Sequence, residues 1–122
     1  MEFTVHDLQG QRFVEGTPRQ PLMGRVEDVI TVLEACFDNA VDRLLLYSEN
    51  LTDHFFDLSS GEAGEILQKL RNYHIRLAIV RSPTLRLSRR FGELMADESR
   101  GSYFRLFDER ADAQEWLCFE GA

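Results

Sequence analysis

The sequence predicts a single α/β domain with a mostly parallel sheet. Short, nearly continuous apolar runs at residues 43–48, 76–81 and 103–107 are typical of strands buried on both faces. Amphipathic helical patterns lie between these runs, and strands that alternate with helices favour right-handed crossovers between parallel strands. The length of 122 residues matches one domain of ordinary size, and no internal repeat or linker divides the chain.

The N-terminal residues predict a hairpin that precedes the alternating elements. Residues 2–7 alternate apolar and polar side chains, as a half-buried strand does, and a turn at 8–11 leads to a second short strand at 12–15. Residues 16–24 contain two prolines and predict a loop. The hairpin leaves an edge strand that can pair between chains, so a homodimer is one alternative for the oligomeric state.

Apolar residues at helical spacing predict four helices. The first begins at Arg25, ends near Asp38 and is expected to bury one apolar face, made of Val26, Val29, Ile30, Leu33, Cys36 and Phe37. Residues 63–74 and 88–98 predict the next two helices. Their inward residues are expected to be Ala63, Ile66, Leu67 and Leu70 and, in the second, Phe91, Leu94 and Met95. Asp108 is the expected N-cap of the last helix.

The composition limits the partners that the protein can bind. Lysine and arginine number 14 against 21 acidic residues, which gives a formal net charge of −7. This surplus of acidic residues argues against binding to nucleic acids and to anionic membranes, because both attract basic surfaces. No apolar run reaches the roughly 20 residues of a membrane-spanning helix, and the N-terminus lacks the pattern of a signal peptide. We therefore expect a cytoplasmic protein, with Cys36 and Cys118 as reduced thiols.

The sequence carries no catalytic, metal or cofactor signature. His6, His54 and His74 share no metal-ligand spacing with one another or with the cysteines, so no metal site is expected. His54 lies near Asp53 and Ser59, but no nucleophile elbow accompanies them. No glycine-rich phosphate loop or dinucleotide fingerprint follows a strand, so no cofactor is expected. These observations predict a protein that is not an enzyme, with no catalytic residue to assign.

The stretch from residue 55 to 73 carries the most positional information in the chain. Ser59 followed by Glu62 has the form of a capping box, in which each side chain bonds the amide of the other residue. Gly61 and Gly64 fall in the helical pattern, where a glycine costs about 1 kcal/mol relative to alanine. Gly64 therefore predicts a close approach, either of this helix to the sheet or of a partner to this helix.

Two serines mark the start of this helix as a candidate binding site. Ligands of α/β sheets bind beyond the carboxyl ends of the strands, where helix N-termini also point. Ser59, Ser60 and Gly61 are expected at this edge. Two hydroxyls at a helix start suit a phosphate, bound or covalently attached, because the free amides and the dipole favour negative charge. The alternative is that the serines only cap the helix.

An aromatic pair precedes the serines. Phe55 and Phe56 are adjacent and cannot face the same way in regular structure. One ring is expected in the core. The other is expected over the helix start or in an exposed contact patch, to which we assign Phe56.

Four arginines form the basic cluster of this acidic chain. They are Arg81, Arg86, Arg89 and Arg90. Arginine suits bidentate recognition of carboxylates and phosphates, and basic residues at a helix start oppose the helix dipole. We interpret the cluster as a site for an anion or an acidic partner beside the serine turn. The alternative is a solvated loop and helix start.

Several short segments between Leu44 and Leu117 carry a family resemblance. They are Phe55-Phe56-Asp57-Leu58, Gly61-Glu62-Ala63-Gly64-Glu65, Leu67-Gln68-Lys69, Asn72-Tyr73, Leu77-Ala78-Ile79-Val80 and Glu98-Ser99-Arg100-Gly101. In these segments the chain resembles an uncharacterised bacterial family catalogued as domain of unknown function 4180. This resemblance implies no known activity.

A more distant resemblance concerns the helix start. The element order and Asp57-Leu58-Ser59-Ser60-Gly61 resemble the STAS fold of anti-sigma-factor antagonists. Those proteins carry Asp-Ser-Ser-Gly at the start of the equivalent helix, and a kinase phosphorylates the first serine. By position the switch residue is Ser59, with Ser60 adjacent. The chain departs from that pattern by the inserted Leu58, and by Glu62-Ala63 where the antagonists have a leucine before the next glycine.

Two functions follow as expectations. The first is a non-enzymatic regulatory module of STAS-like fold, which binds a protein partner through the Ser59 turn and its helix and is switched by phosphorylation. The alternative is a sensor of small anionic molecules, or an unrecognised enzyme. It would use a pocket at the carboxyl ends of the strands, where Arg81, Arg89 or Arg90 holds the anion.

Overall fold

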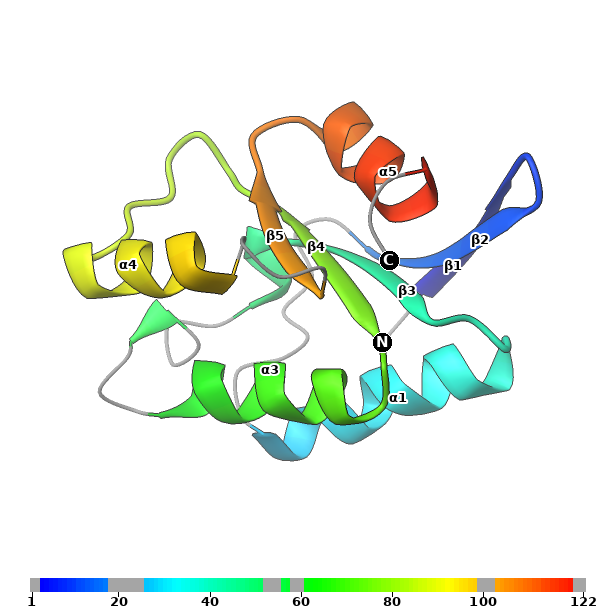
Figure 1. Cartoon of the computed structure of the whole chain (residues 1–122), viewed down its shortest axis with the longest axis horizontal. Helices are drawn as coiled ribbons and strands as arrows, with labels where there is room; N and C mark the ends of the chain where they lie inside the picture. The colour runs from blue at the N-terminus through cyan, green and yellow to red at the C-terminus, as the bar shows by residue number, and fades with distance from the viewer. Residues whose placement is uncertain (1–2, 18–25, 52–55, 58–60, 99–102, 120–122) are drawn as a thin grey trace.

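In the part of the chain that the structure describes, the sheet has five strands, and helices cover both of its faces (Figure 1). The structure is a computed structural model, which describes residues 3–17, 26–51, 56–57, 61–98 and 103–119. Within these residues the chain forms a single α/β domain, with a mixed, mostly parallel sheet and four α-helices.

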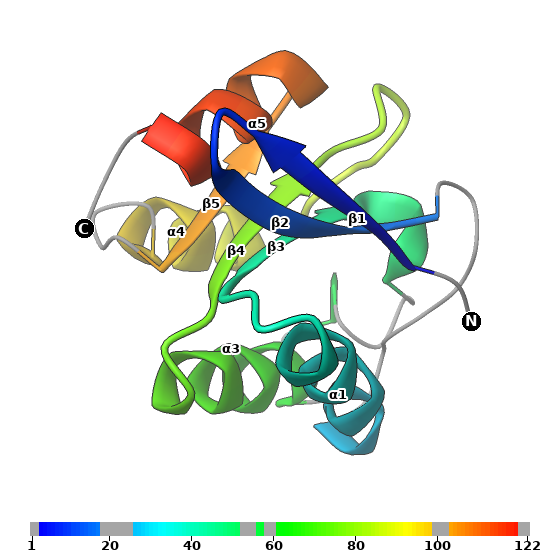
Figure 2. The ribbon, with the colours of Figure 1, turned by 90° about the vertical axis from the view of Figure 1, so that its right-hand side faces the viewer.

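The strands lie in the sheet in the order in which they follow in the chain. They are β1 (Phe3–Leu8), β2 (Gln11–Gly16), β3 (Arg43–Tyr47), β4 (Arg76–Val80) and β5 (Phe104–Phe107). β1 and β2 pair antiparallel, and the other neighbouring pairs are parallel (Figure 2). The three apolar runs form β3, β4 and β5, as predicted.

A two-residue turn joins β1 to β2. Gln9 and Gly10 both have positive φ, 54° and 85°, which is the geometry of a type I′ turn. Asp7 Oδ1 accepts a hydrogen bond from the Gly10 amide at 2.9 Å. Because the twist of this turn matches that of paired strands, it sets the register in which Val5 lies opposite Val14.

The helices of the three crossovers share one face of the sheet, and the last helix lies on the other face (Figure 2). They are α1 (Val29–Asp38), α3 (Glu62–Asn72), α4 (Arg89–Glu98) and α5 (Arg110–Phe119), with short 3₁₀ helices η1 (Val26–Asp28) and η2 (Ser48–Asn50). Right-handed crossovers that advance in a constant direction place α1, α3 and α4 on one side. In the described part of the chain, no helix combines the length and apolar character needed to cross a membrane.

Alternating strand residues build a hydrophobic core on each face. Facing α1, α3 and α4, the buried strand residues are Val14, Leu44, Leu46, Leu77, Ile79 and Phe104. Facing α5, they are Phe13, Leu45 and Ala78, which pack with Ala113, Trp116, Leu117 and Cys118. The second core is smaller because, of the described helices, α5 is the one that covers that face.

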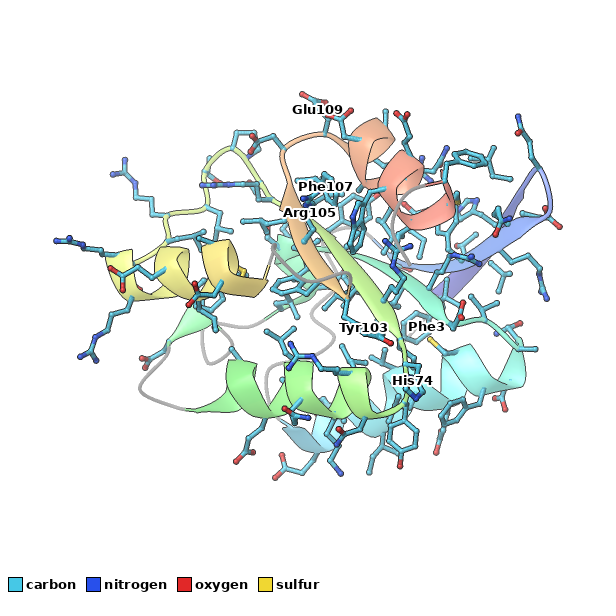
Figure 3. All side chains as sticks on the ribbon, viewed as in Figure 1. Phe3, His74, Tyr103, Arg105, Phe107 and Glu109 are labelled. Atoms are coloured by element: carbon cyan, nitrogen blue, oxygen red, sulfur yellow. The ribbon has the colours of Figure 1, made fainter. Side chains whose placement is uncertain are left out.

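Two arginine side chains from the strands contact α5 on its face of the sheet. Arg76 is buried, and its guanidinium lies 4.1 Å from the centre of the Trp116 ring. Arg43 Nε and Arg76 Nη1 both donate to the carbonyl of Leu117, at 2.9 and 3.1 Å. Cations near the last turn of a helix complement its dipole. Phe107 lies on the same face beside α5 (Figure 3), with its ring centre 5.6 Å from that of Trp116.

The inward faces predicted for α3 and α4 are confirmed. The fully or nearly buried residues are Ala63, Ile66, Leu67 and Leu70 in α3 and Phe91 and Met95 in α4, with Leu94 partly buried against them.

The buried face of α1 differs from the predicted one. Its buried residues are Val29, Val32, Leu33 and Cys36. The prediction that Ile30 and Phe37 face the core is wrong, because both are more than half exposed. Each follows a buried residue and so lies about 100° further around the helix. The apolar stripe predicted from the sequence therefore covers more of the surface of α1 than the part that packs against the sheet and α3.

Candidate functional site

The carboxyl ends of β3 and β4 border a cavity of about 360 Å³. It is lined by Ser48, Glu49, Leu51, Phe56, Ser82, Thr84, Leu85 and Arg86. Residues 48–51 follow β3, and residues 82–86 belong to the connection from β4 to α4. The cavity therefore lies at the edge of the sheet where α/β proteins bind ligands.

Three hydroxyl side chains line this cavity, those of Ser48, Ser82 and Thr84. Ser48 is buried, and its Oγ accepts a hydrogen bond from the Ser82 amide at 2.9 Å. This bond ties the end of β3 to the end of β4. The hydroxyls of Ser82 and Thr84 are hydrogen-bonded at 2.9 Å, so they present a paired polar surface on one side of the cavity.

Asn50 fixes the neighbouring strand ends. Its Oδ1 accepts from the Tyr47 amide at 2.8 Å, and its Nδ2 donates to the Thr17 carbonyl at 2.6 Å. Gly16 makes room for this side chain, since a Cβ at residue 16 would lie 2.7 Å from Asn50 Oδ1. The carboxyl ends of β2, β3 and β4 are therefore preorganised by side-chain hydrogen bonds.

Phe56 forms an apolar wall of the cavity. Its side chain is half-buried and packs against the larger core, with its ring centre 5.3 Å from that of Phe91. The ring thus faces both the core and the cavity. Phe55, the other member of the aromatic pair, lies outside the described residues.

Arg81 braces the loop that follows β4. Its Nη2 donates to the Leu85 carbonyl at 3.1 Å, and its Nε lies 3.7 Å from Asp108 Oδ1. The prediction that Asp108 caps the last helix is wrong, because α5 begins two residues later at Arg110. The Asp108 carboxylate instead lies beside a guanidinium from a neighbouring strand end.

The other arginines of the predicted cluster lie in the loop before α4 and in the first turn of that helix. Arg86 is exposed and lines the cavity. Arg89 and Arg90 are exposed in the first turn of α4, and Arg89 Nε lies 3.6 Å from Glu93 Oε1. Of the four arginines, Arg86 lines the cavity and Arg81 is hydrogen-bonded to the loop beside it. An anion or partner site on these arginines stays a prediction.

The start of α3 differs from the predicted capping box. Ser59 and Ser60 lie outside the described residues, so their roles stay predictions. The helix begins at Glu62, with Gly61 at the N-cap in a left-handed conformation, φ 75°. A capping box needs its glutamate at the third helical position. Because Glu62 is the first, the predicted box is wrong.

Gly64 lies on the outer side of α3. It is exposed, and a Cβ at this position would meet no described atom within 4 Å. The predicted close approach of the helix to the sheet is therefore wrong, because Ala63 and Ile66 occupy the inward positions. The approach of a partner to this helix stays a prediction.

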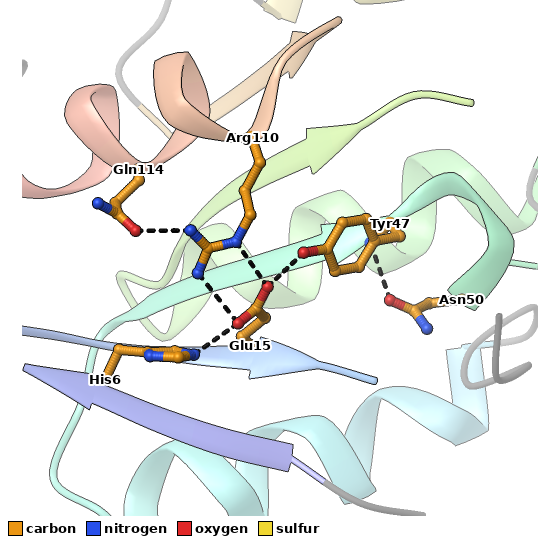
Figure 4. Close-up of polar contacts among 6 residues, drawn as sticks. All are labelled: His6, Glu15, Tyr47, Asn50, Arg110 and Gln114. Carbon is orange, nitrogen blue, oxygen red and sulfur yellow. Dashed lines mark hydrogen bonds and ion pairs between the residues drawn. The ribbon is translucent and has the colours of Figure 1, made fainter. Parts of the chain in front are cut away.

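Sequence reasoning missed a polar cluster around Glu15 on the α5 face (Figure 4). Arg110 binds the carboxylate with two donors, Nε to Oε2 at 2.9 Å and Nη2 to Oε1 at 3.2 Å. The Tyr47 hydroxyl donates to Oε2, and His6 Nε2 lies 2.5 Å from Oε1. Gln114 holds Arg110 from the other side, accepting from Nη1 at 2.9 Å.

The titration of the cluster follows from these contacts. Burial raises the pKa of Glu15, but the hydrogen bonds and charge of Arg110, with hydrogen bonds from Tyr47 and His6, outweigh it. The pKa of Glu15 is therefore held below its usual value of 4.5. Burial, together with the hydrogen bond to Glu15 and its charge, raises the pKa of Tyr47 to about 12. The carboxylate stays ionised, and the phenol stays protonated, at neutral pH.

This cluster joins elements rather than offering a reactive group. Its members come from β1, β2, β3 and α5, and the donors already occupy both oxygens of Glu15. One signal in the sequence could have found it, namely a glutamate in β2 that points to the same face as the buried Phe13. Among the described residues, no group of three or more His, Cys, Asp and Glu side chains is arranged to hold a metal ion.

Both cysteines are buried and unbridged. Burial, together with the charge of Asp42, raises the pKa of Cys36 to about 12. Burial also raises the pKa of Cys118, against the opposing charges of Arg43 and Arg76. Neither thiol has the lowered pKa of a reactive cysteine.

The fold and the site define a class of protein: a single α/β domain with a mixed, five-stranded sheet and a cavity at the carboxyl ends of its parallel strands. Comparison with known families then places the chain. It belongs to the family described as Domain of unknown function (DUF4180), whose family model matches residues 8–117. No curated protein and no solved structure matches the chain.

Proposed function

We propose that this protein is a non-enzymatic, cytoplasmic regulatory module of STAS-like type, which binds a protein partner at the carboxyl edge of its sheet. The observation that carries this proposal is the cavity between η2 and the loop after β4. It is open to solvent, with Phe56 as an apolar wall and Arg86 as an exposed cation. Aromatic and arginine side chains are enriched among the residues that dominate protein interfaces.

The chemistry of the lining also favours binding over catalysis. Among its described residues, Glu49 and Arg86 are the ionisable ones, and neither histidine nor cysteine is present. The Ser48 hydroxyl accepts a backbone amide, and those of Ser82 and Thr84 bond each other. Among the described residues, none of these hydroxyls is hydrogen-bonded to a histidine or a carboxylate that could act as its base.

The STAS-like part of the proposal rests on topology and on the start of α3. The strands follow one another in the sheet in chain order, and α3 begins at Glu62, three residues after Ser59 in the sequence. In STAS proteins the regulatory serine occupies the corresponding turn. A phosphate at Ser59 would add about −1.5 to −2 charges to the turn that leads into α3.

Mass spectrometry of the protein purified from its native host tests the switch. We expect phosphate on Ser59, and a partner that is retained differently by wild type, Ser59→Ala and Ser59→Glu. Thr4→Glu is a matched control, since it adds the same charge at an exposed residue of β1. Equal recovery of the partner with all these proteins contradicts the switch.

A second candidate function is the binding of a small anionic molecule. The cavity of about 360 Å³ falls in the size range of ligand pockets, and Arg86 with the Ser82 and Thr84 hydroxyls supplies donors for a carboxylate or phosphate. A thermal-shift screen with nucleotides and organic acids tests this function, because a bound ligand stabilises by mass action. Stabilisation that Arg86→Gln abolishes supports it, and no shift across the panel contradicts it.

A further inference from the structure

A second surface runs along the exposed side of α1 to the opposite edge of the sheet, where α1 and α3 end. Four large hydrophobic side chains of the described residues are about half exposed: Ile30 (56%), Phe37 (55%), Tyr73 (51%) and Phe119 (51%). Ile30 and Phe37 are two turns apart on one side of α1. Tyr73 follows α3, and its ring meets that of Phe37 edge to face, with centres 5.6 Å apart. We call Ile30, Phe37 and Tyr73, with the cavity beside them, the α1/α3 surface.

The cavity in this surface also has a volume of about 360 Å³. It is lined by Cys36, Phe37, Ala40, Val41, Asp42, Tyr73 and Ile75. Apart from Asp42, the lining side chains are apolar or aromatic, as suits an apolar anchor from a partner.

The cavity is held in shape by the ends of the two helices. The Val41 amide donates to the Cys36 carbonyl, and the Ile75 amide donates to the Leu70 carbonyl, both at 2.9 Å. Such bonds close the last turn of a helix and fix the direction of the chain that leaves it. The cavity is therefore built by backbone hydrogen bonds as well as by side chains.

The charge on α1 is of one sign. Residues 26–42 contain five acidic residues and no lysine, arginine or histidine. Glu34 lies between Ile30 and Phe37 along the exposed side of α1, and Asp38 follows Phe37. Neither Glu34 nor Asp38 has an ion pair with a described residue.

Among the described residues, the cations near this acidic side belong to β2, β3 and α3 and not to α1. Arg12 Nη1 donates to the Asn39 carbonyl at 3.0 Å, and Arg43 Nη1 lies 3.7 Å from Asp42. Lys69 and Arg71 are in the last turn of α3. The acidic residues beside Phe37 thus have no opposite charge on α1 itself.

We propose that the α1/α3 surface binds a basic amphipathic helix of a partner protein. An aliphatic or aromatic residue of that helix fills the cavity beside Phe37 and Tyr73, and its lysines or arginines lie against Glu34 and Asp38. An exposed apolar cluster rimmed by charge is typical of an interaction site, and charge complementarity selects the partner. This surface is separate from the site of the proposed function, at the other edge of the sheet.

The charges argue against two other occupants. A second copy that packed its α1 against this α1 would bring Glu34 and Asp38 close to acidic residues of the same kind, and like charges across an interface are unfavourable. An anionic membrane would repel α1 in the same way. A basic helix is the occupant that the acidic residues attract.

The test uses a synthetic amphipathic peptide of about five helical turns, with leucine on one side and lysine elsewhere. A matched peptide carries glutamate in place of lysine. Fluorescence anisotropy is expected to show that the lysine peptide binds at least about tenfold more tightly, and less tightly as salt rises. Phe37→Ser is expected to weaken binding by roughly tenfold.

Matched controls distinguish binding at the α1/α3 surface from a general attraction of the basic peptide to an acidic protein. Phe119→Ser removes an equally exposed ring from α5, and Glu115→Lys reverses an exposed charge on α5. Each control is expected to change affinity less than about twofold, whereas Glu34→Lys weakens binding and flattens its salt dependence. Circular dichroism confirms that each variant is folded.

Three results would overturn the proposal. The first is a lysine peptide that binds no more tightly than the glutamate peptide. The second is an equal loss of binding in Phe37→Ser and Phe119→Ser. The third is self-association of the protein alone that Phe37→Ser abolishes in sedimentation, which would assign the surface to a second copy of the chain.

Discussion

Glu15 connects described parts of the chain that are far apart in the sequence. It receives hydrogen bonds from His6, Tyr47 and Arg110, which lie in β1, β3 and α5. Glu15→Gln removes the charge that Arg110 faces and is expected to lower the free energy of unfolding by about 2 kcal/mol. Urea denaturation measures the change. Glu109→Gln, at an exposed residue just before α5, is the control and should stay within about 0.5 kcal/mol of wild type.

Because of the Glu15 carboxylate, we expect the stability of the fold to depend on pH. Because the pKa of Glu15 is lower in the folded protein than in the unfolded chain, its ionised form stabilises the fold above the unfolded pKa, and this stability is lost as pH falls through the folded pKa. The stability difference between wild type and Glu15→Gln should be constant at neutral pH and shrink once pH falls below 4.5. Unfolding curves at several pH values check this, and a difference that grows on acidification contradicts it.

Replacing Gly61 or Gly64 with alanine is expected to change the stability of the protein in opposite directions. Gly64 is exposed in α3, with space for a Cβ, so Gly64→Ala is expected to stabilise the protein by about 0.5–1 kcal/mol. Gly61 has a φ of 75°, so Gly61→Ala is expected to destabilise it by about 1 kcal/mol. Thermal unfolding of the pair measures both changes. Equal shifts of the same sign would show that the assigned start of α3 is wrong.

Among the described helices, α5 is the one that covers its face of the sheet, and Trp116 is its largest buried side chain. The ring packs against Phe107 and under the guanidinium of Arg76. Trp116→Ala is expected to lower the free energy of unfolding by about 3–5 kcal/mol. The control is Phe119→Ala in the same helix, whose ring is half exposed and should matter little. Circular dichroism in urea measures both, and similar losses would contradict the docking of α5 described here.

Helical periodicity predicted α3 and α4 better than it predicted α1. In α3 and α4 the polar residues bound a narrow apolar stripe, and the predicted inward residues are buried. In α1 the apolar residues extend around more of the helix, so the pattern could not separate the enclosed side from the exposed Ile30 and Phe37. The start of α3 was also missed. A serine followed by a glutamate suggests a capping box, but the left-handed Gly61 places Glu62 first in the helix.

At the scale of the whole molecule, the alternation of elements predicted the α/β class and the buried strands, because those depend on local pattern. The edge that carries the cavity was also predictable, since it follows from parallel strands. The Glu15 cluster was not predictable, because residues 6, 15, 47 and 110 lie far apart in the sequence. They come together only when the strands pair and α5 packs on the sheet. The arginines were predicted as one site, but α4 carries Arg89 and Arg90 along its first turn while Arg86 stays at the cavity.

We expect a protein partner to bind at the carboxyl edge of the sheet. Quantitative affinity purification from the native host tests it, with wild type, Arg86→Glu and the control Arg12→Glu, which reverses an exposed charge on β2. We expect one partner to be retained by wild type and the control and lost, by about tenfold or more, with Arg86→Glu. Equal retention by all three proteins, or no specific partner on wild type, would contradict this expectation.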